Sequence, residues 1–236
     1  MQDQNKPFLL SSPVINTNIL AQLGAALTSD DVTLLRSLGK VKKFPKNAVF
    51  VHSGDTVDQL VYLEKGLVRM VATGEDGTER TYSYNTPGTF LGDAAFFHRQ
   101  PVLYDLRFEE ASEILLIDRK DLPRLLERQS FVQFWLTSIS LVSRTLAMQI
   151  EDAAFRTTKE KVCRVLLCLS GTEYVQYKTH FTHQEIADLV GVHRVTVTNT
   201  LQALKKEKII HIANRGEITV VDREKLRSKI QGKIEI

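Results

Sequence analysis

Hydrophobic and polar positions divide the chain into segments with different periodicities. Residues 1–40 mix turn-forming residues with one weak helical pattern between Ile19 and Leu38. From Val41 to Asp121, short β-rich runs are separated by turn residues, with glycines recurring among them, and the Asp76-Gly77 pair is typical of a hairpin turn. Many short strands at such spacing predict an antiparallel barrel or roll.

A long helix is predicted from Phe131 to Phe155, where the chain contains neither glycine nor proline. One apolar stripe runs along this helix at steps of three and four residues, and Phe134, Leu141 and Met148 add a second apolar face. A small roll has too little surface to cover both faces, so we expect the stripe to form a dimer interface. Burial against the chain's own roll is the alternative. The stripe residues assigned to the interface are Trp135, Ile139, Val142 and Leu146.

Two short amphipathic runs with a glycine between them lie near the end of the chain. Thr182 and Glu185 form a capping-box pattern, which predicts a helix that begins directly after the threonine. Gly191 can adopt a positive φ at the following turn, and a second helix is expected from about His193. Two short helices joined by such a turn are typical of the helix-turn-helix motif.

The second of these helices carries groups that suit the edges of DNA bases. In the motif, its amino-terminal part enters the major groove, where Arg can pair with guanine, Asn with adenine, and Thr or Val can contact the thymine methyl. Two β-rich runs follow within residues 209–222 and predict a small wing with Arg215 at its tip. A helical hairpin alone would be weak evidence, but the wing favours binding to double-stranded DNA. The candidate DNA-binding residues are Thr182, His183, Gln184, His193, Arg194, Val195, Thr196, Thr198, Asn199, Arg215 and Gly216.

The distribution of charge supports a separate carboxy-terminal module. From Thr157 to the end the chain holds 14 Lys and Arg against 9 Asp and Glu, whereas residues 1–156 hold 17 basic and 19 acidic residues. A basic module on a slightly acidic body suits a polyanionic partner. Thr157 or Thr158 is expected to cap the first helix of this module. The expected domains are an N-terminal segment (1–40), the β-roll (41–121), central helices with the dimer interface (122–155) and a winged helix-turn-helix domain (156–236).

Three stretches of the chain resemble the Crp/Fnr family of bacterial transcription regulators. SGDTVDQLVYLEKGLVRM is similar to the family's β-roll signature, PGTFLGDAAFF to its effector-pocket stretch, and THQEIADLVGVHRVTVTNTL to its helix-turn-helix. The resemblance spans about residues 40–222. The wording of EDGTER and VHRVTVTNTL is closest to the halorespiration regulators typified by CprK.

This resemblance implies an α+β fold with an N-terminal antiparallel β-roll like that of cyclic-nucleotide-binding proteins. A long central dimerisation helix and a C-terminal winged helix-turn-helix would follow. It also implies a homodimer on a palindromic promoter site, a small-molecule effector in each roll that alters the pose of the DNA-binding domains, and activation through RNA polymerase. A repressor of the same architecture stays open.

The effector region departs from the cyclic-AMP-binding members of the family. Those members carry Gly-Glu in the pocket stretch and, about ten residues later, an arginine that clamps the cyclic phosphate. Here Gly92 is followed by Asp93, and residues 102–107 read VLYDLR. Because a phosphate buried without its cation is strongly disfavoured, we expect an effector other than cyclic AMP. The candidate effector-binding residues are Gly92, Asp93, Tyr84, Tyr104 and Trp135; with Tyr82 they suit a small aromatic ligand, and ordinary packing is the alternative.

Cysteines and histidines give little support to a metal or redox site. Cys163 and Cys168 are too few for an iron–sulfur cluster held by four thiolates, and we expect both in a reduced core, with a redox switch as the alternative. His52 and His98 are candidate haem ligands, but isolated histidines are usually ordinary surface or core residues. The trio His180, His183 and His193 has no matched fourth ligand, so we expect neither haem nor another metal.

Other classes of protein fit the sequence less well. A cupin-like enzyme would cluster His and Glu on its strands, which His52 and His98 do not do, so we expect no catalytic activity. A binding module without DNA activity would leave Arg194, Asn199 and the wing unexplained. The chain has no signal-peptide pattern and no apolar run near the length of about 18 residues that a membrane span needs, so we expect a cytoplasmic protein without a membrane partner.

Overall fold

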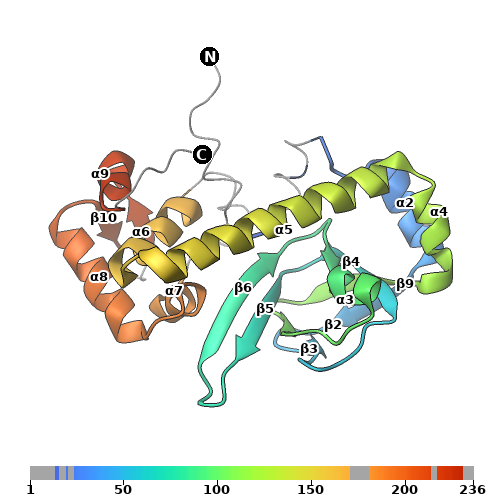
Figure 1. Ribbon diagram of the computed structural model, residues 1–236, viewed down its shortest axis with the longest axis horizontal. Helices are drawn as coiled ribbons and strands as arrows, with labels where there is room; N and C mark the ends of the chain where they lie inside the picture. The colour runs from blue at the N-terminus through green and yellow to red at the C-terminus, as the bar shows by residue number, and fades with distance from the viewer. Residues whose placement is uncertain (1–13, 16–19, 21–23, 171–180, 214–216, 231–236) are drawn as a thin grey trace. The chain divides into compact units, whose positions relative to one another are not determined.

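The computed structural model describes residues 14–15, 20, 24–170, 181–213 and 217–230 of the chain. These residues form two compact units, one mainly from Val14 to Ser140 and the other mainly from Leu141 onward. Helix α5 (Gln129–Phe155) contributes residues to both units (Figure 1). The division therefore falls inside α5, whereas the sequence pattern places a domain boundary near residue 155.

Charged side chains explain why the last turns of α5 belong to the second unit. Arg156 Nε lies 2.8 Å from Asp152 Oδ1, and its Nη2 lies 3.1 Å from Glu151 Oε1. Arg164, in helix α6 (Thr158–Leu169), forms an ion pair with the same Asp152 carboxylate. These pairs fasten the end of α5 to α6.

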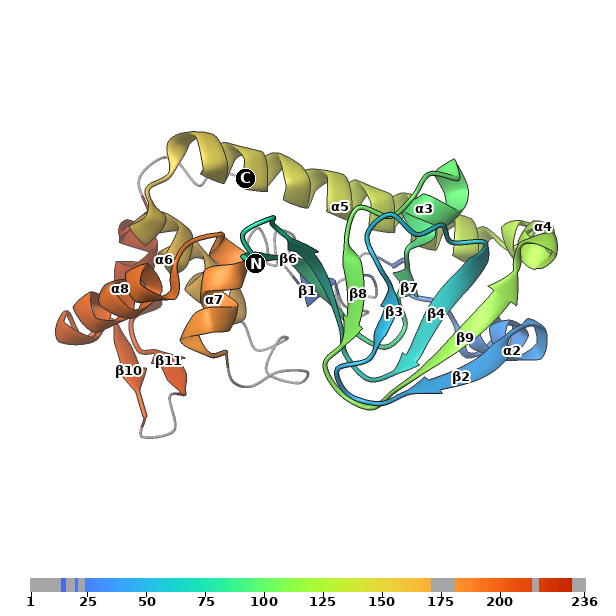
Figure 2. The ribbon, with the colours of Figure 1, turned by 90° about the horizontal axis from the view of Figure 1, so that it is seen from below.

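The first unit is built around two sheets (Figure 2). One sheet has the strand order β1-β6-β5-β8-β3 and the other the order β2-β9-β4-β7. The pairs β2–β9, β4–β9, β4–β7, β5–β8 and β3–β8 are antiparallel, as the sequence predicts, whereas the short β1 lies parallel to β6. The strands are β1 (Val14–Ile15), β2 (Lys40–Phe44), β3 (Val49–Val51), β4 (Gln59–Lys65), β5 (Val68–Thr73), β6 (Glu79–Asn85), β7 (Phe90–Leu91), β8 (Asp105–Phe108) and β9 (Ser112–Asp118).

Buried strand residues form the core of this roll. The hairpin turn predicted at Asp76-Gly77 lies between β5 and β6, and Gly77 adopts a φ of +79° there, a conformation that glycine reaches without strain. The antiparallel strand pairs confirm the predicted roll. Fully buried side chains of its core include Leu60, Val68, Leu106, Phe108 and Ile114.

The weak pattern from Ile19 to Leu38 is not one continuous helix: residues 25–28 are not helical, and a capping box starts α2 (Ser29–Leu38), while residues 19 and 21–23 lie outside the described residues. Asp31 N donates to Thr28 Oγ1 at 3.2 Å, and Thr28 N donates to Asp31 Oδ2 at 2.9 Å. Arg128 and Ser130 also donate to Asp31 Oδ1, at 3.0 and 2.9 Å, so α2 is tied to the start of α5. The shorter helices of this unit are α3 (Asp93–His98), η2 (Arg119–Asp121) and α4 (Leu122–Leu126).

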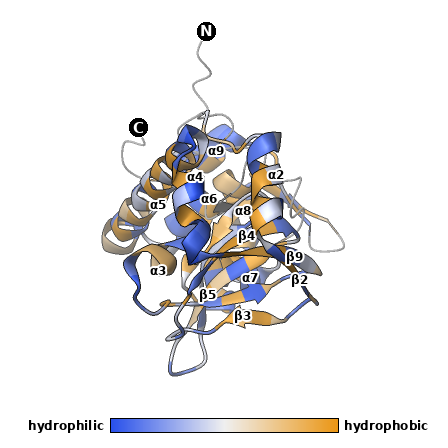
Figure 3. Ribbon diagram, turned by 90° about the vertical axis from the view of Figure 1, so that its right-hand side faces the viewer, coloured by the Kyte–Doolittle hydropathy of each residue, from blue (hydrophilic) through white to orange (hydrophobic). Residues whose placement is uncertain are grey.

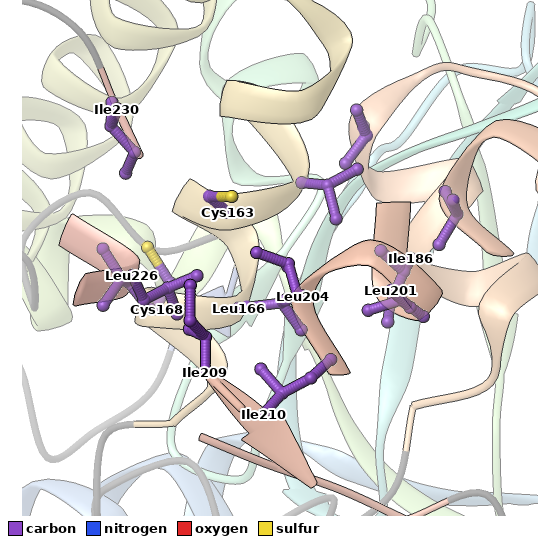
Figure 4. Packing of buried hydrophobic residues seen from close by; sticks show 14 of the residues in the cluster. Cys163, Leu166, Cys168, Ile186, Leu201, Leu204, Ile209, Ile210, Leu226 and Ile230 are labelled. Atoms are coloured by element: carbon purple, nitrogen blue, oxygen red, sulfur yellow. The ribbon is translucent and has the colours of Figure 1, made fainter. Parts of the chain in front are cut away.

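The second unit continues with α6, α7 (His183–Val190) and α8 (Arg194–Lys206), then the strands β10 (Ile210–Ile212) and β11 (Ile218–Val220), and α9 (Arg223–Ser228). Strands β10 and β11 pair antiparallel, which confirms the strands of the predicted wing. Helix α9 was not predicted. One apolar cluster joins these elements (Figure 4); it includes Cys163, Leu166, Cys168, Ile186, Leu201, Leu204, Ile209, Ile210, Leu226 and Ile230.

Both α5 and the strands of the roll carry hydrophobic as well as hydrophilic residues along their length (Figure 3). Within the part of the chain that the structure describes, no helix combines the length and the apolar character that a bilayer span requires.

Candidate nucleic-acid interface and effector region

The turn between α7 and α8 is built by local interactions that the sequence predicts. Glu185 N donates to Thr182 Oγ1 at 3.2 Å, and Thr182 N donates to Glu185 Oε2 at 2.8 Å, so the capping box at the start of α7 is confirmed. Gly191 ends α7 with a φ of +73°, and α8 begins after His193. The Thr182 hydroxyl is therefore occupied as a helix cap.

Helix α8 has a buried face and an outward face. Val197, Thr200, Leu201 and Leu204 are buried, and the leucines belong to the apolar cluster shown in Figure 4. Val195 is 69% exposed on the opposite side. The exposed residues near the start of α8 are the predicted DNA-binding residues Arg194, Val195, Thr196 and Asn199. Of these, Arg194 and Asn199 are the ones expected at base edges.

The outward face extends beyond the residues predicted from the sequence. Gln202 and Lys206 are exposed, and they follow Val195 and Asn199 at helical spacing, which places all four side chains on one face. The helical period of α8 could have identified Gln202 as a residue of this face from the sequence alone. Its amide can pair with adenine in the same way as Asn199.

Thr198, which the sequence placed among the base-reading residues, has its hydroxyl directed into the protein. Its Oγ1 donates to the Arg194 carbonyl at 3.1 Å and lies 2.9 Å from His183 Nδ1. A threonine hydroxyl has a single proton, so His183 Nδ1 carries the proton in the second bond. Only the Thr198 methyl is then available to a base.

His183 is neutral in this arrangement. Burial lowers the pKa of its imidazole, and the positive charge of Arg194 lowers the pKa further. Gln184 is also engaged, because its Nε2 donates to Asp188 Oδ1 at 2.7 Å. A phosphate contact by Gln184 Nε2 would replace this bond.

Uncompensated positive charge accompanies the outward face of α8. Arg194, Lys205, Lys206 and Lys208 form no ion pair within the residues that the structure describes. The wing residues Arg215 and Gly216 lie outside the described residues. A helix with exposed hydrogen-bonding groups and unpaired cations suits the major groove and the phosphate backbone.

Helix α5 carries an exposed apolar stripe at steps of three and four residues. Ile139, Val142 and Leu146 lie on it, as the sequence predicts, and it also includes Val132, Leu136 and Ile150. Trp135 does not: it is only 4% exposed, and its ring packs 5.2 Å from Phe90 and 5.3 Å from Phe97. The apolar period places Trp135 near the stripe, but aromatic residues from other elements of the roll enclose it.

The effector stretch turns into α3 at a glycine. Gly92 has a φ of +64°, and a Cβ there would meet Val57 at 3.6 Å. Ala94 N donates to Asp93 Oδ1 at 3.0 Å, yet burial raises the pKa of Asp93 to about 6. Burial and the nearby Asp93 charge raise the pKa of Tyr104 to about 12. The Tyr104 ring lies 6.2 Å from the Tyr82 ring.

Two further residues of the roll, Tyr84 and Arg69, lie in its interior. Tyr84 is almost fully buried in β6. Arg69, which the sequence analysis did not assign to a site, is nearly as buried; its Nε lies 2.9 Å from Glu109 Oε1, and its Nη1 donates to Thr81 Oγ1 at 3.4 Å. Across the β5–β8 ladder, Arg69 pairs in register with Arg107. The carboxylate of Glu109 balances the charge of Arg69.

His52 and His98 have local polar contacts, and both cysteines are buried; His180 lies outside the described residues. His52 Nδ1 lies 3.6 Å from Asp105 Oδ1, and His98 Nδ1 accepts a hydrogen bond from Gln100 N at 2.9 Å. Among the described residues, no three His, Cys, Asp or Glu side chains gather as a metal site. Burial raises the pKa of Cys163 to about 11, so its thiol stays protonated and unreactive at neutral pH.

Comparison with known proteins matches two separate parts of the chain to family models. A model of the cyclic nucleotide-binding domain matches residues 41–129, and a model of the Crp-like helix-turn-helix domain matches residues 160–229. Together with the roll and the exposed face of α8, these matches define a DNA-binding transcription regulator whose roll is of the kind that binds a small-molecule effector.

Individual relatives have similar length. The HTH-type transcriptional regulator Cmr of Mycobacterium tuberculosis is 24% identical over 208 residues, which cover 88% of this chain and 83% of Cmr. The cAMP-activated global transcriptional regulator CRP of Pasteurella multocida is 26% identical over 179 residues, covering 72% and 85%. CprK solved in complex with OCPA shares the fold at 16% identity, with a TM-score of 0.68 over 92% of this chain and 99% of that one. The chain belongs to the Crp/Fnr family of transcription regulators.

Proposed function

We propose that the protein binds a palindromic promoter site in double-stranded DNA as a homodimer and that α8 reads the base edges. The observation that supports this most strongly is the outward face of α8, where Val195, Asn199 and Gln202 lie opposite the buried residues. Arg194, at the amino-terminal end of α8, suits a guanine, and Asn199 suits an adenine. A two-fold dimer would bind half-sites about 34–36 Å apart, which is one helical turn of DNA.

Phosphate contacts would set the register of α8 in the groove. We assign them to residues around the start of α7, the start of α8 and the wing. His183 and Gln184 would exchange their internal hydrogen bonds for phosphates, and Thr182 would act chiefly by fixing the first turn of α7. The full set of proposed backbone contacts is Thr182, His183, Gln184, His193, Thr196, Arg215 and Gly216.

The exposed stripe on α5 supports the homodimer. Its members Ile139, Val142 and Leu146 follow the three- and four-residue steps of a two-helix seam, and water would otherwise cover them. We place Trp135 outside this interface because the chain already buries it. A second copy of α5 would supply the missing apolar surface.

The roll would bind an effector that prefers one of two dimer poses, because a ligand with equal affinity for both shifts nothing. The Pasteurella CRP is described as activated by cyclic AMP, but the cyclic-phosphate clamp has no counterpart at residues 102–106 here. Arg69 has its charge balanced by Glu109. We therefore propose an effector other than cyclic AMP or cyclic GMP.

The proposed setting is the cytoplasm, where the dimer would activate transcription through RNA polymerase and would have no catalytic role. Selection of random duplexes by the full-length protein, with sequencing of the bound fraction, tests the DNA proposal. We expect an inverted repeat with half-site centres about 10 base pairs apart, or a multiple of this spacing. Enrichment of a single unrepeated motif, or of none, would contradict the proposal.

Calorimetry with cyclic AMP and cyclic GMP tests the effector proposal. We expect no binding at micromolar concentrations. A micromolar dissociation constant that depends on Arg69 or Arg107 would overturn the argument against a cyclic nucleotide.

A further inference from the structure

A groove on the surface of the roll lies apart from the proposed effector region. Its volume is about 320 Å³, within the range of about 300–1,000 Å³ that small-molecule sites usually span. The effector candidates Gly92, Asp93 and Tyr104 do not line it. The groove is lined by residues that precede β4, belong to or follow α3, or begin η2, namely Thr56, Val57, Asp58, Ala95, Arg99, Gln100 and Arg119.

Two arginines give this groove its charge. Arg99 and Arg119 both line it, and neither forms an ion pair with another described residue. Asp58 is the acidic residue of the lining, and its carboxylate also has no ion-pair partner in the described part of the chain. Two cations against one carboxylate leave the groove with a net positive charge, which attracts an anion.

The guanidinium of Arg119 is held in place without being neutralised. It lies 3.9 Å from the centre of the Phe96 ring, and its Nη2 donates to the Phe96 carbonyl at 2.7 Å. Phe96 is fully buried in α3, so it provides a rigid support for the guanidinium. Neither the ring nor the carbonyl carries a net charge, and the other N–H groups of Arg119 stay available to an oxyanion. A side chain that is ordered before the ligand arrives lowers the entropic cost of binding.

Arg99 has a backbone conformation that favours glycine. Its φ is +57°, and its N–H ends α3 by donating to the Ala95 carbonyl at 2.9 Å. A left-handed residue at the end of a helix is usually glycine, because a Cβ is strained there. The exposed Arg99 side chain has no hydrogen bond or ion pair among the described residues that would account for an arginine at this position. Strain of this kind is concentrated at binding sites.

Neutral groups of the lining suit an oxyanion with an organic body. Thr56 contributes a hydroxyl and Gln100 an amide, so hydrogen-bond donors come from different segments of the chain. Val57 and Ala95 are buried and give the groove an apolar floor. Its volume of about 320 Å³ is roughly ten times that of one water in the liquid, about 30 Å³, which leaves room for more than a bare anion.

We propose that this groove binds a small phosphomonoester whose phosphoryl group lies between the guanidinium groups of Arg99 and Arg119. A phosphoryl group has three terminal oxygens and close to two negative charges at neutral pH, which suits two arginines and further neutral donors. A carboxylate has two oxygens, which a single arginine satisfies in the bidentate manner. The site is additional to the effector region, and its ligand does not depend on the proposed contacts with DNA.

Calorimetry on the full-length protein in chloride buffer tests the chemistry of the ligand. The probes are glycerol 3-phosphate, inorganic phosphate and glycerate, which joins a similar body to a carboxylate. We expect glycerol 3-phosphate to bind with a dissociation constant of about 1 mM or below, glycerate to bind at least about tenfold more weakly, and inorganic phosphate to bind no more tightly than glycerol 3-phosphate. The proposal would be overturned by glycerate or inorganic phosphate binding more tightly than glycerol 3-phosphate, by equal affinity for glycerate, or by no saturable binding of glycerol 3-phosphate below about 10 mM.

Arginine variants locate the site. Arg99→Gln should weaken the binding of glycerol 3-phosphate by at least about fivefold, because it removes one of the two cations. Arg124→Gln is the matched control, since Arg124 is exposed on α4 and does not line the groove. Arg194→Gln controls for phosphate binding on α8. Both controls should stay within about twofold of the parent. Full affinity in Arg99→Gln, or an equal loss in Arg194→Gln, would refute the assignment.

Two further variants separate ligand binding from stability. Arg99→Gly should weaken binding as Arg99→Gln does and yet keep or raise the melting temperature, since glycine adopts a φ of +57° without strain. Asp58→Asn should strengthen binding by about twofold to fivefold, because it removes the like charge from the groove. A lower melting temperature of Arg99→Gly would show that Arg99 serves the fold instead of a ligand, and weaker binding by Asp58→Asn would contradict the charge argument.

Discussion

Arg69 in the roll and Arg194 on α8 carry the same side chain in opposite surroundings. Arg69 is almost fully buried, and its Nε lies 2.9 Å from Glu109 Oε1. Arg194 is exposed and forms no ion pair with the described residues. A cation with an internal partner contributes to the fold, whereas one without a partner is available to a polyanion.

Two aspartates of the first unit repeat the contrast. Burial tends to raise the pKa of Asp31, but hydrogen bonds from Thr28, Arg128 and Ser130 outweigh it and hold the pKa below its ordinary value. Burial also acts on Asp93, where it dominates and raises the pKa to about 6. Charges that the chain leaves unbalanced therefore mark the sites where we expect ligands, and balanced charges mark the framework.

The largest expected effect, on dimerisation and DNA affinity, comes from placing a charge in the apolar stripe of α5. Leu146→Glu puts a carboxylate in the apolar stripe of α5, and an unpaired charge in a closed seam is relieved by opening the seam. We expect monomers that keep a folded winged unit and bind the palindrome about 100-fold more weakly or worse. Sedimentation reports the mass, and circular dichroism reports the fold.

Leu126→Glu is the matched control for this change. Leu126 lies on α4 and is 44% exposed, close to the 46% of Leu146, but it is outside the stripe. It should leave the dimer intact. A Leu146→Glu protein that remained dimeric with parental affinity for DNA would show that the stripe is covered within one chain.

The next largest effect is on the free energy of unfolding and concerns Arg69. Arg69→Met leaves Glu109 without its partner in the roll, and breaking a largely buried pair costs about 3 kcal/mol of the free energy of unfolding. Urea denaturation measures this cost. Arg194→Met, the same change at an exposed position, should stay within about 0.5 kcal/mol of the parent. Equal effects of the two variants would break the comparison.

The Asp31 cluster should show its contribution through pH. Because the folded-state pKa of Asp31 lies below the ordinary value of 3.8, this contribution is present above the unfolded pKa and is lost as pH falls through the folded pKa. Asp31→Asn should therefore cost about 1–2 kcal/mol at pH 7, with the difference shrinking below about pH 4. Denaturant midpoints for both proteins across this range provide the measurement. A cost that did not change with pH would show that the carboxylate charge is irrelevant.

A smaller effect is expected at His183. Its pKa is lowered in the free protein, so the imidazole is neutral above the ordinary value of 6.5, and a neighbouring phosphate would favour the protonated form. DNA affinity should thus rise roughly threefold as pH falls from about 8 to 6. His183→Gln should flatten this slope, and His52→Gln, in the roll, should not. An unchanged slope in His183→Gln would remove the proposed phosphate contact.

Features that depend on neighbours in sequence were predictable. The capping box of Thr182 and Glu185, the positive φ of Gly191 and the hairpin at Asp76-Gly77 all follow from the local chain, and the structure confirms them. The weak apolar period from Ile19 to Leu38 did not show the non-helical residues 25–28, after which the capping box at Thr28 starts α2. Gln202 was missed although the period of α8 places it on the outward face.

Features that depend on distant residues were not predictable in the same way. The ion pair of Arg69 and Glu109 joins positions 40 residues apart in the chain. Helical spacing places Trp135 near the exposed stripe of α5, but only the folded roll brings Phe90 and Phe97 against it. Thr198 likewise lies at a position of α8 suited to base contact, but its hydroxyl is hydrogen-bonded to His183 of α7. Periodicity gives the face of a helix and not the partner that covers it.

Titration of the parent, Arg194→Ala and Arg215→Ala on a selected palindrome and on a scrambled duplex of the same composition tests the central claim that α8 reads DNA bases. Arg194→Ala should cost about 1–3 kcal/mol per half-site on the palindrome and almost nothing on the scrambled duplex, so that sequence preference falls. Arg215→Ala, proposed as a phosphate contact, should weaken both duplexes alike and reduce the salt dependence. An Arg194→Ala protein that kept the parental affinity and preference for the palindrome would contradict the assignment of α8 as the base-reading helix.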